Sequence, residues 1–168
     1  MGIPSELTGP AHDIAKRLVA RGETLSVCES SAGGLISAAL LSYPGASKFY
    51  VGGTVIYTPS GVKAQLGSSP VPRPDPVRGA SEPWARYLAA AVREQLGTSW
   101  SVSETGATGP TANPYGDPPG HTWVAVASHD GSVVARNILT GDDNREANMV
   151  AFAAAGLNLL LASLSGCC

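Results

Sequence analysis

The chain has 168 residues, of which 43% are hydrophobic and only 14% are charged. This composition excludes an intrinsically disordered protein and favours one compact domain over residues 1–168, with a substantial hydrophobic core. The formal net charge of −2 leaves no basic excess to neutralise phosphates, so we expect no nucleic-acid partner.

The cysteines and histidines indicate neither a disulfide framework nor a metal site. Cys28 stands alone, and Cys167 and Cys168 are adjacent at the end of the chain, which favours a reducing, cytoplasmic environment. The tail resembles a double-cysteine prenylation signal, although an ordinary chain terminus is the favoured interpretation. The three histidines are scattered and lie near no cysteine pair, so we expect no metal.

The ends of the chain also predict neither secretion nor a membrane span. The segment Met1–Glu6 has no basic or apolar signal region. The most apolar stretch, residues 147–164, contains Asn148, Gly156 and Asn158 and is rich in alanine. It is short for a membrane span, so we predict a buried amphipathic helix.

The first half of the chain alternates helical and strand patterns. Apolar residues at helical spacing predict a helix over the second ten residues, ended by Gly22. A polar turn then separates a short strand from a second helix, and a long strand with a glycine pair precedes a third helix. These later elements are predicted at residues 24–28, 35–41, 49–57 and from 58 onward.

The second half predicts one helix, three strands and a final helix. A proline-rich loop over residues 69–76 precedes the helix at 81–97, and the strands are expected at 100–103, 122–127 and 133–139. Asp130-Gly131 is typical of a hairpin between the last two strands. The order α-β-α-β-α-α-β-β-β-α predicts an α/β fold, a three-layer α/β/α domain with a mixed, mostly parallel sheet.

Four segments are expected to meet at one edge of this sheet. They are residues 29–34, Tyr57 with Lys63, residues 105–110 and residues 141–145. Three of them lie at or just after a predicted strand, and ligands of open α/β sheets bind at the carboxyl ends of strands. The loop from 105 to 120 is also long for a simple connection, which is typical of functional loops.

The turn at residues 29–34 allows three interpretations. Its unpaired N–H groups can hold an anion at the start of a helix. Its serine can act as a nucleophile with oxyanion donors beside it. Ser30 can also serve only as a helix cap.

These segments resemble motifs of the CinA C-terminal domain family, whose stand-alone form is nicotinamide-mononucleotide amidohydrolase. The resemblance extends from about residue 8 to residue 164. The family's Glu-Ser-Cys-Thr-Gly-Gly is similar to Glu29–Gly34, its Gly-Gly-x-x-x-Tyr to Gly52–Tyr57, and its Thr-Gly-Ile-Ala-Gly-Pro to Thr105–Pro110. Further similar segments are Pro44–Ser47, Gly79–Glu82 and Gly120–Trp123. Each motif is weak alone, but their order and spacing make the set specific.

The resemblance implies hydrolysis of the carboxamide of nicotinamide mononucleotide to nicotinate mononucleotide and ammonia. Ser30 would be the nucleophile and Lys63 its base, while Tyr57 would relay the proton or orient the ring. The N–H groups around Ala32 to Gly34 would form the oxyanion hole or hold phosphate. The substrate-binding residues would be Glu29, Ser31, Ala32, Gly33, Gly34, Thr105, Gly106, Gly109 and Arg145. No cofactor, metal or membrane is implied, and a homo-oligomer is expected.

Two departures from the family pattern keep other functions open. Ser31 and Ala32 replace the family's Cys and Thr, and Lys63 lies six residues after Tyr57, where the family's lysine lies five after. One residue turns a helix by about 100°. Either a local insertion restores the geometry or Lys63 points away. The alternatives are a catalytically silent nucleotide-binding or regulatory module and an amidase with another substrate.

Overall fold

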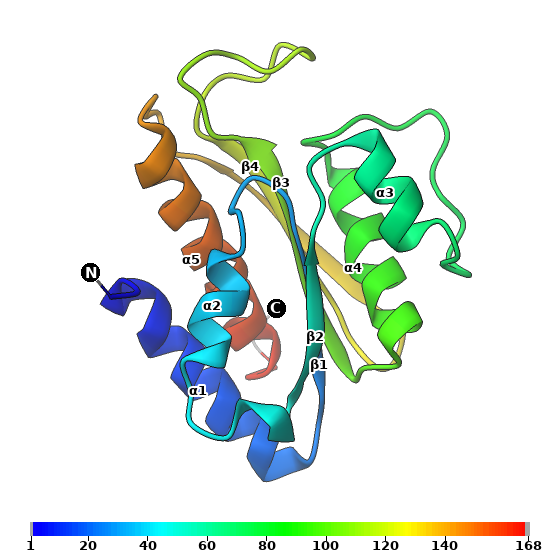
Figure 1. Cartoon of the computed structure of the whole chain (residues 1–168), viewed down its shortest axis with the longest axis vertical. Helices are drawn as coiled ribbons and strands as arrows, with labels where there is room; N and C mark the ends of the chain where they lie inside the picture. Colours follow the sequence, from blue (N-terminus) through cyan, green and yellow to red (C-terminus); the bar gives the residue numbers. More distant parts are fainter. Residues whose placement is uncertain (1, 167–168) are drawn as a thin grey trace.

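The computed structural model describes residues 2–166, in which one sheet lies between two layers of helices (Figure 1). The tail that carries Cys167 and Cys168 lies outside the described residues. The helices are α1 (Ser5–Arg21), α2 (Leu35–Leu41), α3 (Pro59–Leu66), α4 (Glu82–Leu96) and α5 (Arg145–Ser163), with a short 3-10 turn at Ala46–Lys48. The strands are β1 (Leu25–Glu29), β2 (Tyr50–Val55), β3 (Trp100–Ala107), β4 (His121–Ala127) and β5 (Val133–Leu139).

The five strands form one mixed sheet in the order β2-β1-β3-β4-β5. β1 pairs in parallel with both β2 and β3, whereas β4 runs antiparallel to β3 and β5 antiparallel to β4. β4 is therefore the one reversed strand of this sheet, and the predicted α/β fold with a mixed, mostly parallel sheet is confirmed. The carboxyl ends of β1, β2 and β3 meet at one edge, which is the upper edge in Figure 1.

Each face of the sheet is covered by its own helices. α1, α2 and α5 pack together on one face, and α3 and α4 lie on the other (Figure 1). The first layer encloses fully buried side chains such as Ile36, Phe152 and Leu157. The second encloses Trp84 and Leu88 with residues of α3. Two such layers bury both faces of the central strands, as the continuous burial of β1 shows.

Helix α1 begins earlier than the sequence pattern predicts. The expected start near residue 11 is wrong, because the helix runs from Ser5 through Pro10. Leu7 and Ala11 are fully buried on the same side of the helix, so the core-facing stripe extends past the proline. Packing against the core therefore outweighs the hydrogen bond that Pro10 cannot donate.

Helix α5 occupies the stretch predicted to form a buried amphipathic helix, and it is buried along one side. It is the one helix among residues 2–166 that is long and apolar enough to cross a membrane by length and composition. Its side chains at Phe152, Leu157 and Leu160 are fully buried in the core. It packs on β3 and β4 and beside α1, so the buried side of the helix belongs to the core.

Candidate active site

The serine turn connects the carboxyl end of β1 to the start of α2. Gly33 and Gly34 have φ angles of +69° and +99°, in the left-handed region that favours glycine. A Cβ at Gly33 would lie 2.8 Å from the Cε atom of Met149 on α5. The path of the chain therefore favours glycine at both positions.

The carboxylate of Glu29 caps helix α2. Its Oε2 accepts hydrogen bonds from the amides of Gly34 and Ile36, each at 3.0 Å. Its Oε1 accepts from the amide and the hydroxyl of Ser37 at 2.9 and 2.7 Å. Glu29 is fully buried, so its carboxylate serves the start of α2 and is closed to the solvent from which a substrate would approach.

A second buried carboxylate, Glu104 on β3, holds the other side of the turn. Its Oε2 accepts from the amides of Ser30 and Ala32 at 3.1 and 2.7 Å. Its Oε1 accepts from the hydroxyls of Ser31 and Thr122. Burial raises the pKa of this carboxyl, and no Lys or Arg forms a salt bridge with it within residues 2–166. The sequence analysis missed Glu104, although a glutamate inside a buried strand was an available signal.

The turn leaves few groups free for chemistry. The Ser30 side chain is partly exposed, and its hydroxyl has no hydrogen-bond partner among the described residues. The amide of Gly33 reaches the Ser30 carbonyl at 3.3 Å. With Ala32 and Gly34 bonded to carboxylates, the amide of Ser31 is the one in the turn that has no partner within residues 2–166.

Arg145 joins two of the predicted site segments. Its Nη1 donates to the carbonyl of Gly109 and its Nη2 to the hydroxyl of Tyr57, both at 2.9 Å. Arg145 is the first residue of α5, whose start is capped by the side chain of Asn144. The Tyr57 side chain is itself 63% exposed, so this guanidinium lies at an open rim.

The carboxyl end of β3 and the first residue after it make mainly structural contacts. The hydroxyl of Thr105 accepts from the amide of Ala80 at 3.1 Å. A Cβ at Gly106 would come within 2.6 Å of the His121 carbonyl, so glycine is needed for close packing of β3 on β4. The hydroxyl of Thr108 is buried and has no partner among the described residues.

Lys63 is not joined to Ser30 in this structure. Its side chain is exposed on α3 and forms no hydrogen bond or salt bridge with any of residues 2–166. The preceding residue, Val62, is only 8% exposed and packs with Leu66 and Trp84 beneath α3. Val62 stands where the family's lysine is expected, and its burial shows that no local insertion brings Lys63 into that position.

The loop that follows residue 108 is tied to the loop before α4. Arg78 forms a salt bridge with Asp117, and its guanidinium lies over the Tyr115 ring at 5.5 Å. The hydrogen bond from Arg78 holds the pKa of Asp117 below its usual value. Nε2 of His121 lies 3.0 Å from the carbonyl oxygen of Ala80, which places this side chain beside the same loop.

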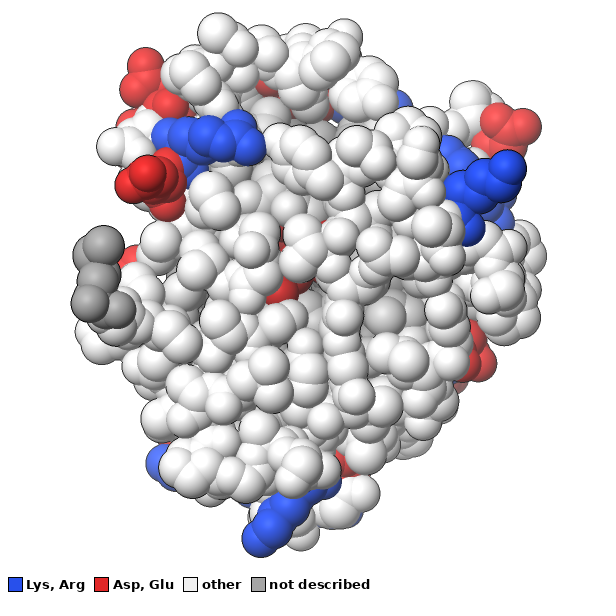
Figure 2. Space-filling view, in the orientation of Figure 1, with Lys and Arg blue, Asp and Glu red and all other residues white. Residues whose placement is uncertain are grey.

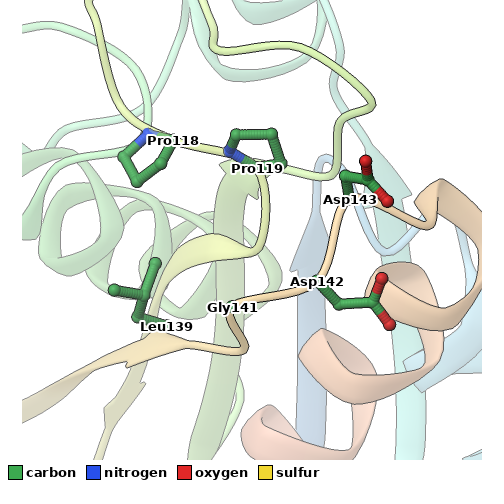
Figure 3. Close-up of a pocket in the computed structure, with 6 residues that line it drawn as sticks. All are labelled: Pro118, Pro119, Leu139, Gly141, Asp142 and Asp143. Carbon is green, nitrogen blue, oxygen red and sulfur yellow. The ribbon is translucent and has the colours of Figure 1, made fainter.

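A cavity of about 680 Å³ borders this loop (Figure 3). Pro118 and Pro119 line one side, and Leu139, Gly141, Asp142 and Asp143 line the other. Its lining includes none of the three residues predicted to be catalytic. Within residues 2–166, no three His, Cys, Asp or Glu side chains lie close enough together to hold a metal ion.

Charge is unevenly distributed over the face shown in Figure 2. Lys and Arg side chains lie toward its margins, and its middle is largely uncharged apart from a small acidic area. Of the predicted binding residues, Arg145 supplies the cation at the rim. It is therefore the described residue best suited to an anionic group of a ligand near Tyr57.

A family model and individual relatives both relate this chain to CinA proteins. Residues 8–164 match the CinA C-terminal domain. A CinA-like protein from Anaeromyxobacter sp. is 36% identical over 151 residues, which is 90% of this chain and 36% of the relative. A putative competence-damage inducible protein from Geobacillus kaustophilus is 37% identical over 155 residues, 91% of this chain and 36% of that protein. The chain thus spans about a third of the length of these curated relatives.

Solved structures share the fold. The competence/damage inducible protein CihA from Agrobacterium tumefaciens superposes with a TM-score of 0.87 at 25% identity, over 98% of this chain and 99% of that one. A CinA superfamily protein from Klebsiella pneumoniae gives a TM-score of 0.86 at 21% identity, over 95% and 98% of the two chains. At that identity, the second likeness shows the fold alone.

Proposed function

Since the chain belongs to the CinA C-terminal domain family, we propose that it is an amidohydrolase that converts nicotinamide mononucleotide to nicotinate mononucleotide. Water is consumed and ammonia is released. The observation that carries the proposal is the Ser30 hydroxyl, which is free of hydrogen bonds within residues 2–166 and stands on a turn held by two buried carboxylates. A nucleophile needs a fixed position and an unengaged oxygen, and this turn supplies both.

In the proposed reaction, the Ser30 oxygen attacks the carboxamide carbon. The C–N bond breaks, the nitrogen leaves as ammonia after gaining a proton, and an acyl ester to Ser30 remains. Water then hydrolyses the ester and restores the hydroxyl. The amide of Ser31 supplies one donor to the oxyanion, and Arg145 binds the 5′-phosphate beside Tyr57.

Lys63 is proposed as the base that takes the proton from Ser30. In this structure it is exposed and unbonded within residues 2–166, so the pair must form by movement of the lysine side chain or of α3 when substrate binds. Catalytic hydrogen bonds are often long or absent in ligand-free enzymes and tighten on binding. The proposal also places the protein in the cytoplasm, where the buried thiol of Cys28 stays reduced.

The exposed position of Lys63 favours a second candidate function. A module that binds a nucleotide without turning it over would need Arg145 and the loop after β3 but no base near Ser30. The exposed position of Lys63 fits this candidate without any movement. The two functions differ in whether ammonia is produced.

The deciding experiment is release of ammonia from nicotinamide mononucleotide by the pure protein. We expect turnover by the wild type and a loss of kcat of about 1,000-fold or more in Ser30→Ala, with unfolding by urea unchanged. Lys63→Ala should lose kcat and Lys63→Arg should not restore it, since arginine stays protonated. Ser42→Ala is the matched control, because Ser42 is a helix-terminal serine outside the site.

Binding with no ammonia release would support the silent module and refute the hydrolase. Binding is measured by calorimetry with nicotinamide mononucleotide. Arg145→Gln should weaken binding under either function, because both use the guanidinium for the phosphate. Turnover that survives in Ser30→Ala would refute Ser30 as the nucleophile.

A further inference from the structure

Most amide donors of the Ser30 turn are already engaged by carboxyl groups of the protein itself. Amides at the start of a helix usually attract anions from outside the protein. Here Glu104 takes the amides of Ser30 and Ala32, and Glu29 takes the amide of Gly34. The turn, as described within residues 2–166, therefore has no set of free donors with which to hold a phosphate, and the acceptor oxygens of two buried carboxyl groups already occupy its amides.

Glu104 reaches the turn from a distant part of the chain. It lies on β3, 74 residues from Ser30, and is fully buried. One of its oxygens takes two backbone amides that flank Ser31, and the other takes the Ser31 hydroxyl. Thr122 on β4 donates to the same carboxylate at 3.2 Å, so Glu104 links the turn to two strands of the sheet.

We propose that Glu104 is a positioning residue for the reaction proposed above, and that it fixes the backbone of Ser30 so that the amide of Ser31 remains the oxyanion donor of the turn. The inference rests on the proposed function. It assigns the phosphate of the substrate to Arg145 and the loop after β3, because most amides of the Ser30 turn are already bonded to Glu29 and Glu104. Glu104 touches neither substrate nor reacting atoms, so it acts through the position of Ser30.

The hydrogen-bond geometry explains why a carboxylate is suited to this task. An amide N–H can only donate, so the oxygen that serves Ser30 and Ala32 must be an acceptor. A leucine in place of Glu104 would leave both amides buried without partners, and the turn would shift to find others. A glutamine keeps one acceptor oxygen for the two amides, and the hydroxyls of Ser31 and Thr122 can reverse their roles toward its NH₂ group.

The test compares Glu104→Leu and Glu104→Gln with wild type in ammonia release from nicotinamide mononucleotide. We expect Glu104→Leu to lower kcat by about 100-fold, with KM changed less than about threefold, because a misplaced nucleophile slows the chemical step. Glu104→Gln should retain kcat within about tenfold of wild type. Unchanged kcat in Glu104→Leu, or a loss seen only in KM, would overturn the proposal.

Ser103→Ala is the matched control. Ser103 is the neighbouring residue on β3, is also fully buried, and donates from its hydroxyl to the Ala85 carbonyl on the other face of the sheet. This variant should lose stability while keeping kcat. An equal loss of kcat in Ser103→Ala would show that any damage to β3 suffices, which refutes positioning by Glu104.

Hydrogen exchange separates this proposal from the proposed function. In Glu104→Leu, the amides of Ser30 and Ala32 should exchange faster, while those of α1 keep their rates. If wild type releases no ammonia but Glu104→Leu shows this local increase in exchange, the hydrolase is refuted while fixation of the turn by Glu104 is supported. If Glu104→Leu does not fold, Glu104→Asp carries the test, because its shorter side chain draws the acceptor oxygens back from the amides of Ser30 and Ala32: kcat lowered more than about threefold supports the proposal, and kcat within about threefold of wild type overturns it.

Discussion

The two halves of the candidate site are held by the fold to very different degrees. The serine turn is anchored by Glu29 and Glu104, both fully buried, through hydrogen bonds to amides and hydroxyls. The segment from Tyr57 to Lys63 is largely exposed, and one hydrogen bond from Arg145 joins it to the rest of the site. The difference indicates that the position of Ser30, the proposed nucleophile, is fixed before a ligand binds, whereas Lys63, the proposed base, is not held near it.

The largest effect is expected from removing the anchor of the turn. Glu29→Ala leaves four donors of α2 without their acceptor. We expect the free energy of unfolding to fall by about 3–5 kcal/mol, because buried donors without partners are costly. Urea denaturation monitored by circular dichroism measures this loss. A decrease below about 1 kcal/mol would show that the turn is not held as described.

A smaller loss of stability is expected from adding a side chain in the serine turn. Gly33→Ala should lower the free energy of unfolding by about 2–3 kcal/mol, from its positive φ and from contact with Met149. Gly22→Ala is the matched control, since Gly22 has a φ of +64° and an added Cβ there would meet nothing within 4 Å. It should cost only about 1 kcal/mol. Equal losses in the two variants would remove the contact with Met149 from the explanation.

The salt bridge between Arg78 and Asp117 should make the free energy of unfolding depend modestly on pH. The pKa of Asp117 is lowered by Arg78, so its contribution to stability is present above its unfolded pKa of about 3.9 and is lost as pH falls through its folded pKa. Arg78 is partly exposed, so we expect Asp117→Asn to cost only about 1 kcal/mol at pH 7. The gap from wild type should narrow as the pH falls below the unfolded pKa of Asp117. Urea titrations at neutral and at acid pH measure this gap, and a gap that widens in acid contradicts the pairing.

The smallest effect on stability is expected at Lys63. Lys63→Ala removes no hydrogen bond or salt bridge within residues 2–166, so the free energy of unfolding should change by less than about 0.5 kcal/mol. Urea denaturation checks this value. A loss above about 1 kcal/mol would mean that Lys63 has a structural contact, and the contrast between the two halves would then fail.

Periodicity and turn residues were sufficient to predict the order of elements and the class of the sheet. They could not predict where α1 begins, because Leu7 joins the helix only through burial against the core. They also could not predict the partner of the serine turn. Glu104 lies 74 residues from Ser30, and only the parallel pairing of β1 with β3 brings the two together.

The position of Lys63 illustrates a second limit of the sequence. Its displacement by one residue relative to the family spacing left two geometries open. The burial of Val62 decides between them, and burial depends on α3 packing beside α4. Segment contacts of this kind arise from the tertiary structure and are not encoded in the spacing of residues alone.

Cys28 is the residue before Glu29, and it is fully buried with a thiol whose pKa is raised by burial. A buried, protonated thiol does not react with alkylating reagents until the protein opens around it. In a variant with Cys167 and Cys168 replaced by serine, the rate of thiol labelling would report how often β1, the strand that leads into the serine turn, becomes accessible. Labelling of the Cys28 thiol would thus measure the rate at which the core around β1 opens.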